Sequence, residues 1–204
     1  LAQNSPKCVD FHPNCNYVLS GSSDKCIRIW EAHTGNCVRI FTGHAAPVTS
    51  LAVSNEGKIF ASAGEDGVHL WDLVSSRRIA TFPVSFPSDY KHYPQTHGDT
   101  WALDISGDST VLATGGSDET VRLFDLRMFS DALDEPTPPA DAVHEPLATY
   151  HTKSTPVHCV TFTRRNLLLA GGPFKNPKKA CKFDLNLLDE FDLREVSLIK
   201  RRVR

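Results

Sequence analysis

Several segments and motifs that would mark a membrane protein or an enzyme are missing from this 204-residue sequence. No apolar run approaches the roughly 18 residues that a membrane-spanning helix needs, and no basic and then apolar leader opens the sequence. None of the six cysteines lies in a Cys-x-x-Cys pair, and none of the nine histidines stands with a cysteine or carboxylate at metal-ligand spacing. A Gly-rich phosphate loop and a Gly-x-Ser-x-Gly turn are also absent. We therefore expect no signal peptide, no membrane segment, no metal, no cofactor and no catalytic residue.

The composition is that of an ordinary soluble globular protein, with 40% hydrophobic and 23% charged residues. The lack of paired cysteines indicates a reducing compartment, the cytosol or the nucleus. The net charge is only −2, but residues 164–204 carry a surplus of Lys and Arg, whereas residues 1–163 carry a surplus of Asp and Glu. The basic end is either a contact surface for nucleic acid or an acidic partner, or a solvated charged end.

A unit that recurs three times is the most informative feature of the sequence. It covers Ser20–Trp30, Ser62–Asp72 and Thr114–Asp125, and each copy has an aspartate in its turn and an aromatic residue near its end. The spacing, together with Gly43-His44 ahead of the second copy, is typical of the roughly 40–45-residue period of a WD-repeat propeller blade.

The second unit divides into four short strands separated by tight turns. Its apolar pattern and its turn residues, chiefly Asn, Gly and Ser, predict strands over 48–53, 59–62, 68–71 and 78–82. Four antiparallel strands of this kind make one blade. The sequence therefore predicts an all-β protein, a WD-repeat β-propeller of which this chain holds about three to four blades.

The partial propeller is expected to cover residues 1–172. Two proline-rich insertions interrupt it, because proline is excluded from central strands and favours loops. The blades are predicted at about 1–42, 43–82, 97–127 and 150–172, with the insertions at 83–96 and 128–149. Residues 173–204 depart from the pattern and are predicted to be a basic tail, either a weak amphipathic helix or disordered.

Polar side chains of the second unit include the residue types of a hydrolase triad, His44, Ser62 and Asp66. Their positions favour another role, since the histidine precedes the first strand, the serine lies on the second and the aspartate is in the turn after it. In WD-repeat blades these groups and Trp71 form a buried hydrogen-bonded network, which fixes one strand register. We therefore predict a structural network and keep the hydrolase as the less favoured alternative.

The other two units hold incomplete copies of this network. The partial sets are Ser20, Asp24 and Trp30 in the first unit and Thr114 and Asp118 in the third. The first unit lacks the histidine. In the third unit His97 is the candidate histidine, and Phe124 replaces the tryptophan and has no N–H to donate. Only the set in the second unit is expected to be complete.

Two stretches of sequence are more specific than a generic blade. One is Cys8–Leu19 with Gly35–His44, and the other is Tyr150–Val157 continued by Phe162–Gly171. Both resemble the WD-repeat TBP-associated factors, the subunit-5 family of the general transcription factor TFIID. The likeness covers about residues 7–172. It departs from the family at Phe124, in the insertion at 83–98 and beyond Pro173.

The resemblance implies a seven-bladed propeller at the C-terminus of a longer, fungal protein. Such a subunit would be nuclear and non-catalytic, would bind other TBP-associated factors including a histone-fold pair within a TBP-containing complex, and would read no DNA sequence directly. In fungi the same subunit would also serve the SAGA coactivator. The alternative functions are a WD-repeat reader of peptides or chromatin and another assembly scaffold.

Two tyrosines in the first insertion, Tyr90 and Tyr93, are the candidate partner contacts. Loops on a rigid frame suit protein–protein contact, and tyrosine is enriched at the centres of interfaces. The same side chains could equally pack the loop onto its own blade, and the sequence leaves these two roles open.

Overall fold

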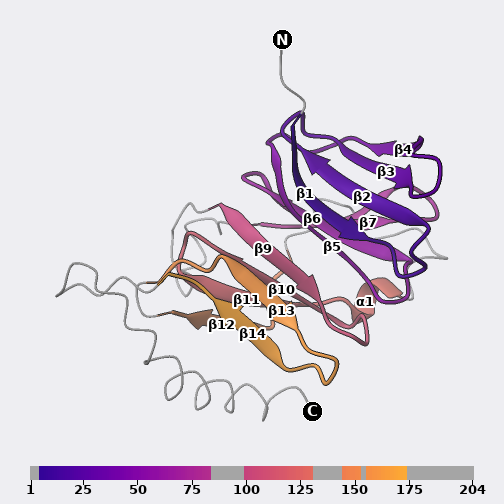
Figure 1. Ribbon diagram of the computed structural model, residues 1–204. Coiled ribbons are helices and arrows are strands. Elements are labelled where there is room, and N and C mark those ends of the chain that lie inside the picture. The colour runs from indigo at the N-terminus through magenta and orange to yellow at the C-terminus, as the bar shows by residue number, and fades with distance from the viewer. Residues whose placement is uncertain (1–4, 84–98, 131–143, 153–154, 174–204) are drawn as a thin grey trace.

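The computed structural model of the chain describes residues 5–83, 99–130, 144–152 and 155–173, and it consists almost entirely of antiparallel β-sheet (Figure 1). Three sheets have four strands and one has two. One short helix, α1 (Arg127–Ser130), is present, and no helix of the described part is long and apolar enough to cross a membrane. The prediction of an all-β, partial propeller architecture is confirmed.

The first two sheets are complete meanders in which sequential strands are neighbours. The first comprises β1 (Pro6–Phe11), β2 (Tyr17–Ser22), β3 (Ile27–Glu31) and β4 (Cys37–Phe41). The second comprises β5 (Val48–Val53), β6 (Ile59–Gly64), β7 (Gly67–Asp72) and β8 (Arg78–Phe82). The four strands predicted in the second unit therefore occur, with β6 and β7 slightly longer than expected.

The third sheet takes its fourth strand from beyond the second insertion. It comprises β9 (Thr100–Ile105), β10 (Val111–Gly116), β11 (Thr120–Asp125) and β12 (Ala148–His151). The predicted boundary, with an insertion to 149 and a new blade from 150, is corrected here, because Tyr150 pairs with Val121 of the third sheet. A four-residue strand that follows a proline-rich segment leaves little periodicity to detect.

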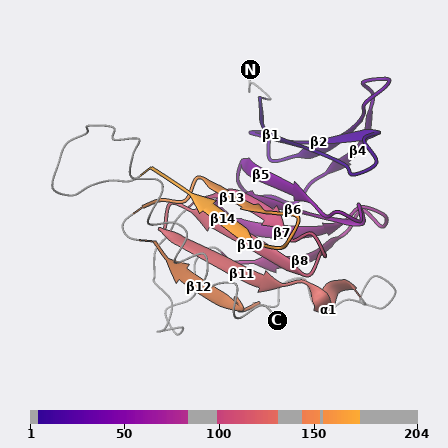
Figure 2. The ribbon, with the colours of Figure 1, turned by 60° about the horizontal axis from the view of Figure 1, so that its bottom comes forward.

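The fourth sheet has two described strands, β13 (Cys159–Phe162) and β14 (Leu168–Gly171). The first strand of each sheet lies next to the first strand of the following sheet, since β1 contacts β5, β5 contacts β9, and β9 contacts β13. We call these four strands the innermost strands. Figure 2 shows the first sheet nearly edge-on beside the second, as expected for blades packed face to face.

Apolar side chains fill the spaces between successive sheets. Between the first and second sheets, Leu19, Ile27 and Phe41 pack with Phe60 and Trp71, all buried. Equivalent clusters join the second sheet to the third and the third to the fourth. The second and third sheets therefore each contribute to two cores, so packing between sheets, rather than within one sheet, supplies most of the buried apolar surface.

Polar bonds add register to this apolar packing. Asp10 of β1 accepts a hydrogen bond from the Val53 backbone N–H of β5 at 2.8 Å, and Asp104 of β9 accepts one from Phe162 of β13 at 2.5 Å. Burial raises the pKa of Asp10 above its usual value, although the bonded backbone N–H groups oppose this effect. These two carboxylates each tie an innermost strand to that of the following sheet.

One face of the first sheet is exposed and apolar. Val9 on β1 is 58% exposed, whereas Leu51, at the corresponding position of β5, is 8% exposed beneath the first sheet. Phe11, Val38 and Ile40 are likewise exposed large apolar side chains of this sheet. An open groove lies on this sheet, lined by Pro6, Val9, Val18, Ser20, Ser22, Arg28 and Trp30. This exposed face of the first sheet is therefore as apolar as the faces that are buried between sheets.

Packing between the third and fourth sheets predicts the effect of a single methyl group. A Cβ at Gly115 would lie 2.5 Å from Val157 Cγ1 and 2.8 Å from Val160 Cγ2, both on short branched side chains that cannot move away. We expect Gly115→Ala to lower the free energy of unfolding in urea by about 1–3 kcal/mol.

The matched control is Gly171→Ala, at the corresponding position of the fourth sheet, where a Cβ would meet nothing within 4 Å. This variant should change the stability by no more than about 0.5 kcal/mol. Equal losses of stability in Gly115→Ala and Gly171→Ala would show that packing against the fourth sheet is not the reason why position 115 requires glycine.

Candidate functional site

The four predicted network residues of the second repeat lie in one chain of contacts. His44 Nδ1 is 2.9 Å from Asp66 Oδ1, and His44 Nε2 is 2.7 Å from Ser62 Oγ. The Trp71 indole N–H donates to the same Ser62 oxygen at 2.8 Å. The loop before β5, strand β6, the turn after it and strand β7 are thereby joined by side chains alone.

The proton positions follow from the partners. An ionised Asp66 can only accept, so His44 carries its proton on Nδ1 and donates it to the carboxylate. The neutral ring then accepts the Ser62 hydroxyl proton at Nε2, and the Ser62 oxygen accepts from Trp71. The hydrogen bonds from Trp71 through Ser62 and His44 to Asp66 thus run in one consistent direction, which is the condition for a buried network to stabilise a fold.

Burial alone would raise the pKa of Asp66. Hydrogen bonds from His44 and from the Ala45 backbone N–H, together with the nearby His69 ring, outweigh this effect and hold the pKa well below its usual value. The carboxylate therefore remains ionised at neutral pH. Its role as a common acceptor explains how one side chain fastens the loop before β5 to the turn after β6.

The hydrolase alternative requires a serine that a substrate can reach. Ser62 has no exposed surface, and His44 is 7% exposed. The Ser62 oxygen already accepts from Trp71, and no strained turn presents it to solvent. This geometry suits a structural hydroxyl rather than a nucleophile.

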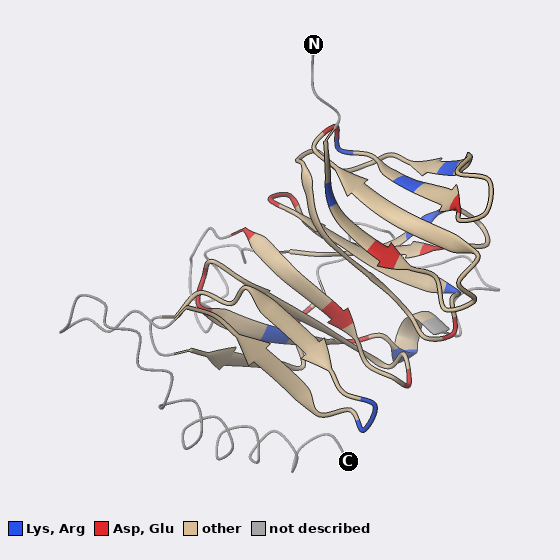
Figure 3. Ribbon diagram, viewed as in Figure 1, with Lys and Arg blue, Asp and Glu red and all other residues tan. Residues whose placement is uncertain are grey.

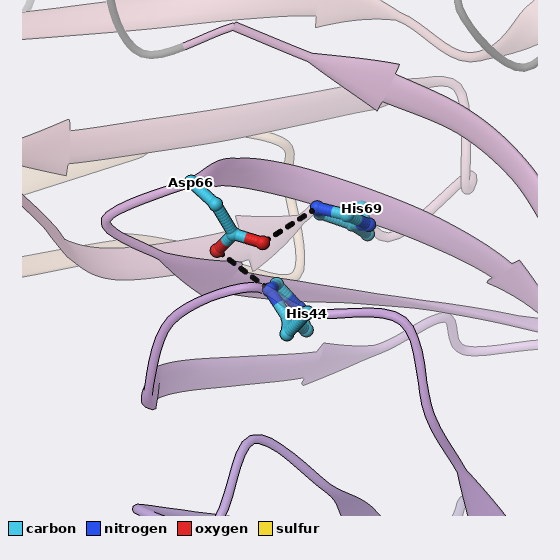
Figure 4. A group of neighbouring side chains, drawn as sticks. All are labelled: His44, Asp66 and His69. Carbon is cyan, nitrogen blue, oxygen red and sulfur yellow. Dashed lines mark hydrogen bonds and ion pairs between the residues drawn. The ribbon is translucent and has the colours of Figure 1, made fainter.

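A fifth residue, His69 on β7, joins this group and was missed in the sequence (Figure 4). Its Nε2 is 3.3 Å from Asp66 Oδ2, and its Nδ1 is 3.3 Å from Arg78 Nη1. An arginine only donates, so the ring accepts at Nδ1 and carries its proton on Nε2. Burial lowers the pKa of His69 and, with the nearby His44 and Arg78, outweighs the Asp66 carboxylate, which acts to raise it.

The signal that could have identified His69 is its place in the repeat. The corresponding residues of the first and third repeats are Arg28 and Arg122, each 2.6 Å from its own turn aspartate. The turn of the second repeat is one residue shorter, with Gly67 at a φ of +123° that favours glycine. His69 therefore stands in i,i+3 rather than i,i+4 relation to Asp66.

The sequence placed no histidine and carboxylate together at ligand spacing, yet the tertiary structure does so. One nitrogen of His44, one of His69 and an Asp66 oxygen all lie within 4.8 Å of one another. Two imidazoles and a carboxylate are ligands that Zn²⁺ accepts. Among the described residues this is the group that could hold a metal ion.

The first repeat contains part of the same network. Trp30 donates to Ser20 Oγ at 2.8 Å, as Trp71 does to Ser62. Asp24 forms an ion pair with Arg28 and accepts from the Cys26 backbone N–H. The exposed groove of the first sheet passes over Ser20 and Trp30, so this copy of the network borders solvent.

The third repeat uses its turn aspartate differently. Asp118 pairs with Arg122 at 2.6 Å and accepts from the Thr120 hydroxyl at 2.8 Å. Thr114 and Phe124 are buried on neighbouring strands. His97, the candidate histidine of this repeat, lies outside the described residues, as do Tyr90, Tyr93 and the tail beyond residue 173.

The stacked antiparallel sheets and the recurring aspartate, serine and tryptophan positions define a β-propeller repeat protein. A sequence model of the WD domain, G-beta repeat, matches residues 3–31, 35–72 and 89–125. The chain belongs to this WD-repeat family, whose members are generally non-catalytic scaffolds.

Several curated proteins are similar to the chain. Transcription initiation factor TFIID subunit 5 of Caenorhabditis elegans is 32% identical over 82% of this chain and 26% of its own length. Pre-mRNA-processing factor 19 of Oryza sativa subsp. japonica is 36% identical over 54% of this chain and 19% of its own length. Nuclear distribution protein nudF of Aspergillus niger is 29% identical over 55% of the chain and 28% of its own length. The chain thus spans about a quarter of the length of these relatives.

The Ser62 hydroxyl offers a direct test of the network. In Ser62→Ala, the His44 and Trp71 nitrogens lose their common partner in a dry environment, so we expect the free energy of unfolding to fall by about 1–3 kcal/mol. Ser20→Ala is the matched control, since Ser20 is only half-buried beside an open groove and its loss should cost less. Urea unfolding followed by tryptophan fluorescence measures both, and equal costs would contradict the role of burial.

The lowered pKa of His69 predicts a pH dependence of stability. The unfolded chain takes up a proton near pH 6.5 that the folded chain binds only at lower pH. The folded state is therefore favoured at higher pH and loses stability as the pH falls below about 6.5, by up to about 1.4 kcal/mol per pH unit. The lowered pKa of His144 acts in the same direction.

His69→Arg isolates the contribution of His69, because arginine does not titrate in this range. Urea midpoints measured between pH 8 and pH 5 should fall less steeply in this variant than in the parent chain. Parallel slopes for the two proteins would mean that His69 is not the titrating group.

Proposed function

We propose that the chain is part of a non-catalytic scaffold subunit of a TFIID-type complex that supports initiation by RNA polymerase II. The observation that carries this proposal is the extent of the similarity to the TFIID subunit. That alignment takes in 82% of the chain, well beyond the matched repeats, whereas the splicing and nuclear-distribution relatives cover 54% and 55%. Similarity that extends beyond the matched repeats is more specific than the repeat pattern itself.

The architecture suits a scaffold. Buried polar networks and inter-sheet cores hold the blades in one arrangement, and the loops between strands can then vary without loss of the frame. Figure 3 shows acidic and basic residues interspersed over the described sheets, with no stripe of one sign in that view. A protein partner therefore fits these sheets better than a nucleic acid backbone, which selects clustered Lys and Arg.

The partners we propose are other TBP-associated factors, including histone-fold subunits, in a TBP-containing nuclear complex. SAGA membership in a fungal source is a further part of the proposal. The contact segments would be the insertion at 83–96 with Tyr90 and Tyr93, the second insertion, which ends before β12, and the basic tail at 173–204. These segments differ from the repeats in sequence, so they are where partner specificity can reside.

One observation favours the alternative of a peptide or chromatin reader. Trp101 on β9 and His158 just before β13 stack with centroids 4.5 Å apart and an interplanar angle of 10°. His158 is exposed and Trp101 half-buried, at the same end of two innermost strands. Such an aromatic pair could hold a planar or cationic side chain of a bound peptide.

Affinity capture distinguishes the two functions. The natural protein that contains this chain, tagged and recovered from nuclear extract, should bring down TBP and histone-fold factors together. Trp101→Ala should leave this recovery unchanged, whereas Tyr90→Ala with Tyr93→Ala should weaken it at least several-fold. Recovery of histone peptides alone, lost in Trp101→Ala, would replace the scaffold proposal with the reader.

A further inference from the structure

We propose that His44, Asp66 and His69 form a binding site for a divalent transition metal ion, with Zn²⁺ as the preferred ion, in the second repeat alone. Figure 4 shows the two imidazoles approaching the carboxylate from two different elements, the loop before β5 and strand β7. The three donor atoms lie within 4.8 Å of one another. This proposal is independent of the TFIID assignment.

The distances between donor atoms suit a tetrahedral ion. Zn²⁺ binds imidazole nitrogen and carboxylate oxygen at about 2.0–2.2 Å, so neighbouring ligand atoms of a tetrahedron stand roughly 3.3 Å apart. Asp66 Oδ1 is 2.9 Å from His44 Nδ1, and Asp66 Oδ2 is 3.3 Å from His69 Nε2. Small side-chain rotations would bring one nitrogen from each ring and one carboxylate oxygen around a common point.

A second observation comes from the hydrogen-bond geometry of His69. Its side chain is only 4% exposed, and its Nε2 makes no well-aligned hydrogen bond despite lying 3.3 Å from the carboxylate. A buried ring nitrogen directed at an oxygen without a good hydrogen bond is costly to leave in this state. Coordination to an ion between the two atoms would satisfy it.

The other two repeats show why the site is confined to the second. Arg28 and Arg122 stand where His69 stands and bind their aspartates directly at 2.6 Å. A guanidinium has no acceptor nitrogen and remains charged, so it cannot act as a ligand. Because histidine replaces arginine and the turn is shorter, the second repeat has metal-ligand atoms where the other two repeats have a permanent ion pair.

Metal binding would move protons within the rings without releasing any. His44 would carry its proton on Nε2 instead of Nδ1 and donate it to the Ser62 oxygen at 2.7 Å, so the Ser62 hydroxyl would have to turn its own proton away from His44. A metal-bound histidine characteristically donates its second N–H to an oxygen in this way. His69 would carry its proton on Nδ1, which faces Arg78 at 3.3 Å, so the arginine would have to turn away.

The ion can reach the site from the loop surface. The Asp66 side chain is 15% exposed, and Ala45 and Glu65 beside it are exposed. A water molecule from this side would complete a three-ligand set, as in zinc sites that keep one position open. The exposed carboxylate of Glu65 adds negative charge on the path of entry.

The test is a titration of the purified, metal-free 204-residue chain with Zn²⁺ against a chromophoric chelator, followed by X-ray absorption at the zinc edge. We expect one ion per chain held by nitrogen and oxygen ligands. His69→Arg should weaken binding by more than the roughly 10- to 100-fold that removal of an outer-shell partner costs. His33→Arg, which removes an exposed histidine of the turn after β3, should leave the affinity unchanged.

Arg78→Glu provides a second variant that leaves the three ligands intact. It replaces a donor that opposes the Nδ1–H of metal-bound His69 with an acceptor that orients it, so Zn²⁺ should bind about tenfold more tightly. Sulfur ligands at the zinc edge, equal affinity in the parent and His69→Arg, or no binding by either the parent or the folded Arg78→Glu variant would each overturn the proposal.

Discussion

The constraint on which this structure depends is that each sheet has an apolar face on either side and can bury both only against neighbouring sheets. Phe60 and Trp71 on one face of the second sheet are covered by the first sheet, while Leu70 and Phe82 belong to the core shared with the third. The sheets are therefore not independent units. The apolar Val9 and Phe11, which have no sheet over them, show what each inner face would look like without its neighbour.

Apolar packing of this kind tolerates small shifts, and directional bonds remove that freedom. Asp10 and Asp104 tie innermost strands across two junctions, and the chain from Asp66 through His44 and Ser62 to Trp71 ties a loop to its blade. The resulting frame places loops rather than reactive groups at its surface. This arrangement agrees with the burial of His44 and Ser62, and it suits the scaffold role that we propose.

Much of the fold was readable from repetition, since strands recur with turn residues at fixed distances. The fourth strand of the third sheet was not, because Ala148–His151 follows a long insertion and has only four residues in which to show a pattern. The network members of the second repeat were also readable, because each stands at a repeat position. His69 escaped notice, since a one-residue shortening of the turn shifts it relative to Arg28 and Arg122.

The sequence by itself determined the all-β class, the blade period and the residue types at each network position, because these depend on local alternation and on spacing along the chain. The tertiary structure alone decided which groups meet. The distance of Val53 from Asp10 and of His69 from both Asp66 and Arg78 depends on strand register, turn length and the stacking of sheets. A contact between sheets such as that of Asp10 with Val53 joins residues far apart in the chain, and no local pattern records it.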